Sequence, residues 1–118
     1  KMKPIKEDRE EIYNILESFN VPVFLQGSMS ECAKYPRLFI TYFLPTVDDV
    51  VHVDNNSFLS QYVVEVAVYG NNIDKVDEMI NAIKTKFKEN DFNFVIAGDV
   101  ASDIQTHTGI MQRFIKIN

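Results

Sequence analysis

The feature that most limits the fold of this chain is an alternation of side chains that ends at Tyr69. Apolar residues recur at even-numbered positions, namely Phe58, Tyr62, Val64, Val66 and Val68, and polar residues fall between them at Ser57, Gln61 and Glu65. Because successive side chains of a strand point to opposite faces, this period predicts a β-strand over Phe58 to Tyr69 with one buried face. At about 3.3 Å per residue, such a strand reaches roughly 35 Å. A core of this size needs less, so we expect part of the strand to project.

Two other stretches have the three- and four-residue spacing of amphipathic helices. The first predicts a helix over Glu7 to Phe19, and its apolar stripe is Ile12, Ile15, Leu16 and Phe19. Asn20 and Pro22 should end it, because proline cannot continue a helical hydrogen-bond ladder. The second predicts a helix over Ile73 to Asn90, with the stripe Ile73, Val76, Met79, Ile80, Ile83 and Phe87. The turn Gly70-Asn71-Asn72 precedes it and supplies an N-cap.

Four more strands complete the predicted order helix, three strands, helix, two strands (αβββαββ). They are Val23 to Leu25, Arg37 to Leu44 (stopped by Pro45), Phe92 to Val100 and Gly109 to Ile117. Adjacent strands have short connections, which favours an antiparallel or mixed sheet with both helices packed on one face. We therefore expect an α+β fold, and residues 1–118 should form a single domain because two domains would each be too small.

The segment between Pro45 and Phe58 allows two interpretations. Four valines lie in it (Val47, Val50, Val51 and Val53), together with Asp48, Asp49, Asp54, Asn55 and Asn56. It could be a long loop, or the extended arms of one hairpin that turns near Asp54 and Asn55. We favour the hairpin, which would then project over residues 45–58.

Charge and hydropathy exclude two classes of partner. The formal net charge is −5 and the basic residues are dispersed, whereas nucleic-acid binding draws its affinity from clustered Lys and Arg. The longest strongly apolar stretch, Tyr62 to Tyr69, is interrupted by Glu65 and is far shorter than the roughly 20 residues that span a bilayer. We expect neither specific nucleic-acid binding nor membrane insertion.

The residues that could carry catalysis are few and isolated. His52 and His107 lie near aspartates, but the chain has no metal-ligand pair of the kind H-x-x-x-H or C-x-x-C. Cys32 is the only cysteine, which excludes an internal disulfide and fits a reducing cytoplasm. No phosphate-cradling glycine loop is present. We therefore predict no enzymatic activity, no metal and no cofactor, and we expect both histidines to be ordinary surface positions.

The order of landmarks along nearly the whole chain resembles one family of phage proteins. An amphipathic helix is followed by Val21-Pro22-Val23, a strand, an Asp- and Asn-rich segment, a long strand and a second helix. The chain closes with Thr106-His107-Thr108-Gly109 and the strand Gln112-Arg113-Phe114-Ile115-Lys116-Ile117. This order is similar to that of the tail-terminator, or tail-to-head joining (tail completion), proteins of long-tailed bacteriophages and prophages. His107 stands where family members often carry an acidic residue.

The resemblance implies a non-enzymatic virion structural protein that assembles as a homo-oligomeric ring, generally of six copies. Such a ring caps the tail tube and docks it to the head, so its partners would be copies of itself, the tail tube protein and the head-completion or connector protein. The protein would be made in the host bacterial cytoplasm and end up in the virion, at the tail end or head-tail junction. Its candidate ring contacts are Val47, Val50, Val51, Val53 and Phe58, and Asp48, Asp49 and Asp54 could face the central channel.

Two other interpretations remain open at this point. A small α+β ligand-binding or regulatory domain could have the same element order, because fold alone does not fix function. An unrecognised hydrolase is the third, and alanine substitution of His52, His107 and Cys32 would test it. The three aspartates could equally belong to a solvated loop with no role in a channel.

Overall fold

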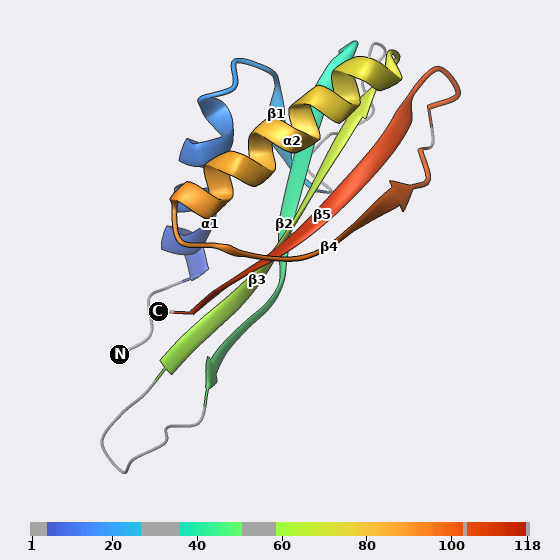
Figure 1. The fold of residues 1–118 in the computed structure, drawn as a ribbon. Helices are drawn as coiled ribbons and strands as arrows, with labels where there is room; N and C mark the ends of the chain where they lie inside the picture. The colour runs from blue at the N-terminus through green and yellow to red at the C-terminus, as the bar shows by residue number, and fades with distance from the viewer. Residues whose placement is uncertain (1–4, 27–35, 51–58, 103, 118) are drawn as a thin grey trace.

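The computed structural model describes residues 5–26, 36–50, 59–102 and 104–117, which form two helices and five strands (Figure 1). In chain order these are α1 (Ile5–Glu17), β1 (Val23–Leu25), β2 (Leu38–Val50), β3 (Leu59–Gly70), α2 (Ile73–Glu89), β4 (Asn93–Val100) and β5 (Thr108–Ile117). The predicted order αβββαββ and the α+β class are confirmed. The helix and strand boundaries agree with the predicted ones to within two residues, except at the end of β2.

The five strands form one mixed sheet in the order β1-β2-β3-β5-β4. β1 runs parallel to β2, and every other neighbouring pair is antiparallel. The central strand β3 pairs with β2 from Gly70 to Leu59 and with β5 from Gly70 to Gln61. Its length explains why the molecule is elongated, at 53 × 26 × 24 Å.

Both helices cover one face of the sheet, as predicted (Figure 1). The fully buried residues of β3 are those of the predicted apolar face, namely Tyr62, Val64, Val66 and Val68. They pack with the predicted helix stripes, of which Ile12, Ile15, Leu16, Val76, Ile80, Ile83 and Phe87 are buried. Phe114 of β5 completes this core by stacking on Phe87, with ring centroids 4.6 Å apart.

The helix ends have the polar caps that their flanking residues indicate. The side chain of Asn72 accepts hydrogen bonds from the backbone N–H groups of Asp74 (3.0 Å) and Lys75 (3.4 Å) at the start of α2. Asn20, just after α1, has a φ of 60°, a left-handed conformation that asparagine tolerates at helix ends. Both residues thus lie at the helix boundaries that the sequence indicates.

The expectation that Pro45 ends its strand is wrong. β2 continues to Val50, and its register to β3 shifts between Phe43 and Thr46, so that Leu44 and Pro45 together oppose one residue of β3. This is a β-bulge, one of the few places where a strand accepts proline. The pairing with β1 stops at Tyr42, so at Pro45 β2 is an edge strand that needs no donor on its outer side.

Candidate interaction surfaces

The segment that the sequence assigns to subunit contacts forms the far end of a β2–β3 ribbon. Val47 pairs with Tyr62, and Val50 pairs with Leu59, so the hairpin interpretation of this segment holds as far as the structure describes it. Val51, Val53 and Phe58 lie outside the described residues. Figure 1 shows the ribbon continuing past the helical layer.

Two of the three candidate channel aspartates lie on the same part of β2. Asp48 pairs with Gln61 and Asp49 with Ser60, while Asp54 is outside the described residues. None of the strand residues that oppose them on β3 is basic. The structure thus places Asp48 and Asp49 together on the projecting ribbon but leaves their channel role as a proposal.

The base of this ribbon is fixed to α1 by a polar cluster that the sequence does not reveal. The Tyr62 hydroxyl donates to Oε1 of Glu11 at 2.6 Å, and Nζ of Lys116 donates to Oε2 of the same carboxylate at 2.7 Å. The Lys116 ammonium also lies 4.9 Å from the centre of the Phe92 ring. One carboxylate of α1 therefore joins β3 and β5, and it does so next to the point where the ribbon leaves the core.

The environment of Tyr62 raises the pKa of its phenol well above the usual value. Burial is the main cause, and the hydrogen bond and negative charge of Glu11 add to it, followed by the charge of Asp8. Burial also raises the pKa of Tyr42, with a smaller contribution from Tyr13. Both phenols accordingly stay protonated in the folded protein through the physiological range.

The face of the sheet away from the helices carries an ion pair among apolar side chains. Arg113 donates to Glu65 across the β3–β5 pair at 2.8 Å. Three half-buried apolar residues neighbour this pair on the same face, namely Val63, Met111 and Ile115. No helix among the described residues covers this face (Figure 1).

The Thr108-Gly109 pair at the start of β5, which belongs to the closing motif of the family resemblance, has a packing explanation here. Gly109 is buried and pairs with Tyr69 across the sheet. A Cβ atom at Gly109 would lie 2.7 Å from Cε1 of Tyr69 and 2.8 Å from Cγ1 of Val100. The Tyr69 ring occupies the space above the glycine and stacks on Phe39, with centroids 5.3 Å apart. Glycine at this position therefore lets an aromatic ring lie against the strand.

His107 belongs to the same cluster, so the expectation that it is an ordinary surface position is wrong. Its imidazole lies 5.9 Å from the Phe39 ring, centroid to centroid, and is half-buried. Nε2 is 2.8 Å from the carbonyl oxygen of Pro36, an acceptor, so Nε2 carries the proton. Nδ1 is 2.8 Å from the Thr106 hydroxyl. His107 thus ties the turn before β5 to the start of β2.

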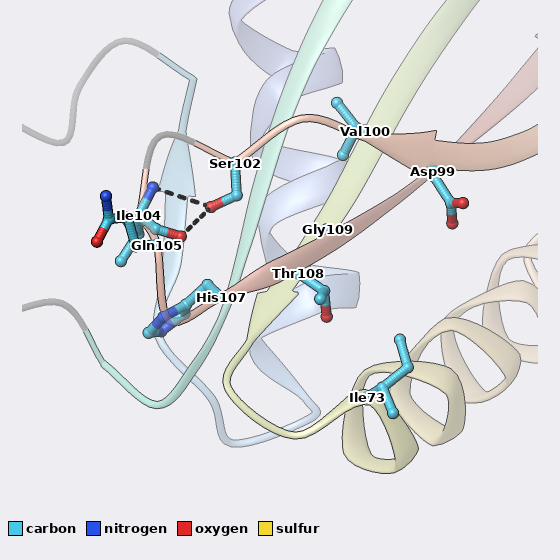
Figure 2. Close-up of a pocket in the computed structure, with 9 residues that line it drawn as sticks. All are labelled: Ile73, Asp99, Val100, Ser102, Ile104, Gln105, His107, Thr108 and Gly109. Atoms are coloured by element: carbon cyan, nitrogen blue, oxygen red, sulfur yellow. Dashed lines mark hydrogen bonds between the residues drawn. The ribbon is translucent and has the colours of Figure 1, made fainter.

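A hollow of about 440 Å³ lies beside this turn (Figure 2). It is open to solvent, and its lining is Ile73, Asp99, Val100, Ser102, Ile104, Gln105, His107, Thr108 and Gly109. Two of its polar groups are already engaged with backbone. The Ser102 hydroxyl donates a hydrogen bond to the Ile104 carbonyl oxygen and accepts one from the Ile104 N–H. The His107 ring is hydrogen-bonded to the Pro36 carbonyl oxygen. The other polar residues of the lining, Asp99, Gln105 and Thr108, are exposed, whereas ligand sites typically bury most of the surface of a bound molecule.

Metal and membrane sites receive no support from the part of the chain that the structure describes. Within it, no group of three His, Cys, Asp or Glu side chains could hold a metal ion. No described helix is long and apolar enough to cross a membrane. Cys32 and His52 lie outside the described residues, so their surroundings are not defined.

Comparison with known proteins gives a likeness that concerns the fold. No protein-family model matches the chain, and no curated protein matches its sequence. Among solved structures, it is similar to a chain in the virion of a native gene transfer agent particle. The TM-score is 0.61 at 10% sequence identity, and the match covers 87% of this chain and 82% of the other. The two chains therefore share a fold over nearly their whole lengths.

Proposed function

We propose that this protein is a non-enzymatic virion structural protein whose copies form a ring that caps a phage tail tube and docks it to the head. The observation that carries the proposal is the fold likeness to a chain of a virion particle, which extends over most of both chains. The landmarks of the sequence resemble the tail-terminator family independently of that likeness. Six is the ring size that this resemblance implies.

The shape of the subunit supports a role in assembly. A ring needs two different patches on each subunit, so that one patch of a copy meets the other patch of the next. The projecting β2–β3 ribbon, with Val47 and Val50 on β2, offers one such patch. The Glu11 cluster fixes the base of the ribbon at Tyr62 and Lys116, so that base does not have to be ordered when a subunit contact forms.

The same ribbon gives the aspartates a role in the proposed ring. DNA that passes a head-tail junction presents a continuous phosphate backbone, and a basic lining would hold it through counterion release. An acidic rim made of Asp48, Asp49 and Asp54 would repel the phosphates and let the DNA slide through the channel. The alternative is that these carboxylates only keep the ribbon end solvated.

A non-enzymatic role is supported by how the described polar groups are used. Glu11, Tyr62 and Lys116 bond to one another at the edge of the core. His107 bonds to Pro36 and Thr106, so it is not free to act as a general base. These contacts hold elements together, which is the expected role of polar groups in a structural subunit.

Electron microscopy of tail tubes tests the proposed function. Tubes from the virus or prophage that encodes the protein are mixed with purified protein carrying a C-terminal tag and a gold label. We expect gold at one end of each tube and none along its length. Label spread evenly along the tubes, or none bound at all, would contradict the capping role.

A further inference from the structure

The outer edge of β4 is an unpaired strand edge with exposed apolar side chains. Among the described residues, β4 ends the sheet and pairs only with β5. Val95 and Ile96 expose 51% and 53% of their surface, and they are two of the four large hydrophobic residues that the described surface exposes. Ala97 and Gly98 are exposed as well. Soluble proteins usually protect such edges with lysine, proline or a covering element.

β4 has little of this protection. It contains no Lys, Arg or Pro, and its only charged residue is Asp99, near its end. A bulge between Phe94 and Ile96 is the one protective device, and it leaves the exposed Val95 unpaired in the ladder to β5. An edge of this kind favours the addition of another strand, because the strand would satisfy its free N–H and C=O groups.

The opposite side of the same sheet has a second free edge. β1 pairs with β2 only from Ile40 to Tyr42. The last hydrogen bond between them is donated by the Gln26 N–H to the Tyr42 carbonyl oxygen, at 2.8 Å. Beyond Tyr42, no described strand pairs with the outer edge of β2, although β2 continues to Val50. Residues 46–50, beyond the Pro45 bulge, and residues 93–100 are therefore two edges without a described partner strand. Pro45 has no N–H to donate, so a ladder added to β2 would begin after it.

We propose that β4 of one subunit pairs antiparallel with the free part of β2 of the next subunit, which joins neighbouring sheets edge to edge. This inference rests on the proposed ring and names its second patch. The two edges are different, as a closed ring requires. The strand directions also agree with antiparallel pairing. Within one subunit β4 runs antiparallel to β2. If the ring axis lies along the strands, rotation from one subunit to the next leaves these directions unchanged.

The distribution of charge is consistent with this alignment. It favours a second copy of this chain, and not another protein, as the molecule that pairs with β4. Antiparallel pairing brings the end of β2 that contains Asp48 and Asp49 to the beginning of β4. Residues 84–94, which lead into β4, hold three lysines and two acidic residues, whereas residues 43–50 hold two aspartates and no base. Lys84 lies directly at the strand, 4.1 Å from the centre of the Phe94 ring.

A lysine on the β4 edge tests the pairing. Val95→Lys replaces an exposed side chain, so the thermal unfolding midpoint should stay close to that of the wild type, while ring assembly should weaken on the order of tenfold or more. Ile73→Lys is the matched control, since Ile73 is also 48% exposed but lies at the start of α2, and its rings should form normally. Unchanged assembly of Val95→Lys would overturn the inference.

Cysteine cross-linking tests the direction of the pairing in a Cys32→Ser background. Val95→Cys is combined in turn with Thr46→Cys, Val47→Cys or Asp48→Cys, and at least one pair should give a ladder of disulfide-linked oligomers. Val95→Cys alone should give no dimer, and a dimer would indicate β4-to-β4 contact and overturn the inference. If rings form but no pair cross-links, the edge contact is wrong while the ring stands. If the wild type forms no ring even on tail tubes, both are wrong.

Discussion

The Tyr62 hydroxyl donates a 2.6 Å hydrogen bond to the carboxylate of Glu11, which lies 51 positions earlier in the chain. The bond connects the long central strand to α1 where the β2–β3 ribbon leaves the core. Lys116 completes the cluster from β5, so a half-buried carboxylate is neutralised by one cation and hydrogen-bonded by one phenol. The central strand is thus held in place by polar contacts at one end of its apolar face.

Removing the Tyr62 hydroxyl should destabilise the fold without exposing the core. Tyr62→Phe keeps the ring against Phe92 but deletes the donor to Glu11, which Lys116 still neutralises. Because hydrogen bonds to charged groups contribute about 1.5 to 3 kcal/mol, we expect a loss of about 2 kcal/mol in the free energy of unfolding. Urea denaturation at pH 7 measures it. Tyr13→Phe, at an exposed tyrosine, should stay within about 0.5 kcal/mol of the wild type.

Alkaline pH should weaken the fold through the same phenol. The pKa of Tyr62 is raised in the folded state, so the unfolded chain loses this proton near its ordinary pKa of 10.0 while the folded chain keeps it. The stabilisation is therefore complete below about pH 10 and is lost progressively as the pH rises above it. Urea midpoints at pH 8 and pH 10.5 should differ more for the wild type than for Tyr62→Phe. Tyr42 also has a raised pKa, so some loss of stability at alkaline pH should remain in Tyr62→Phe. Equal differences for the two proteins would mean that Tyr62 does not contribute to this loss.

Two glycines of the sheet should respond oppositely to alanine. Gly109→Ala forces a Cβ atom into the Tyr69 ring and Val100, so it should cost about 1 to 3 kcal/mol, the usual penalty for overpacking. Gly98→Ala has nothing within 4 Å of the new Cβ and should be neutral or slightly stabilising. Thermal unfolding of the two variants checks this. Equal midpoints would contradict the packing explanation of Gly109.

His107→Ala should be more damaging than an ordinary surface substitution. It removes the hydrogen bond to the Pro36 carbonyl and the contact with Phe39. We expect a loss of about 1 to 2 kcal/mol, measured by urea denaturation. Gln105→Ala, at an exposed neighbour in the same turn, should change the stability by less than about 0.5 kcal/mol. A loss at His107 no larger than at Gln105 would show that the histidine contacts contribute nothing.

The sequence predicts most of this fold because its apolar periods are long and consistent. The alternation that includes Tyr62 and Val68 identifies the central strand, and the stripe from Val76 to Phe87 identifies α2 and its buried face. Pro45 misleads because proline stops a central strand, whereas here it lies in a bulge on an edge. The sequence could not show that β1 covers so little of β2.

The contacts between distant residues could not be predicted. Glu11 meets Lys116 across 105 positions, and His107 meets Pro36 across 71. No local spacing encodes such pairs, since only the completed sheet brings their elements together. The exposure of Val95 and Ile96 could not be predicted either, because an apolar run does not tell an edge strand from a central one.

Reversing the charge of the ribbon end tests the proposed channel role. If Asp48, Asp49 and Asp54 are replaced together by Lys, assembled particles should retain DNA in a salt-sensitive way or eject it more slowly, because the new cations would bind phosphate. Ejection is timed at low ionic strength, where screening is weakest. A variant with three asparagines, which removes the charge without reversing it, should be affected less. Unchanged ejection of the Lys variant would leave the aspartates as a solvated loop.

The mass of the assembled protein tests the central proposal most directly. Multi-angle light scattering is measured across a wide range of protein concentrations, first alone and then with purified tail tubes. We predict a single closed oligomer, close to six times the subunit mass, either free in solution or released from capped tubes after mild dissociation. A monomer in the absence of tubes is compatible with templated assembly. A strict monomer in both experiments would contradict the proposal that this protein is a ring subunit.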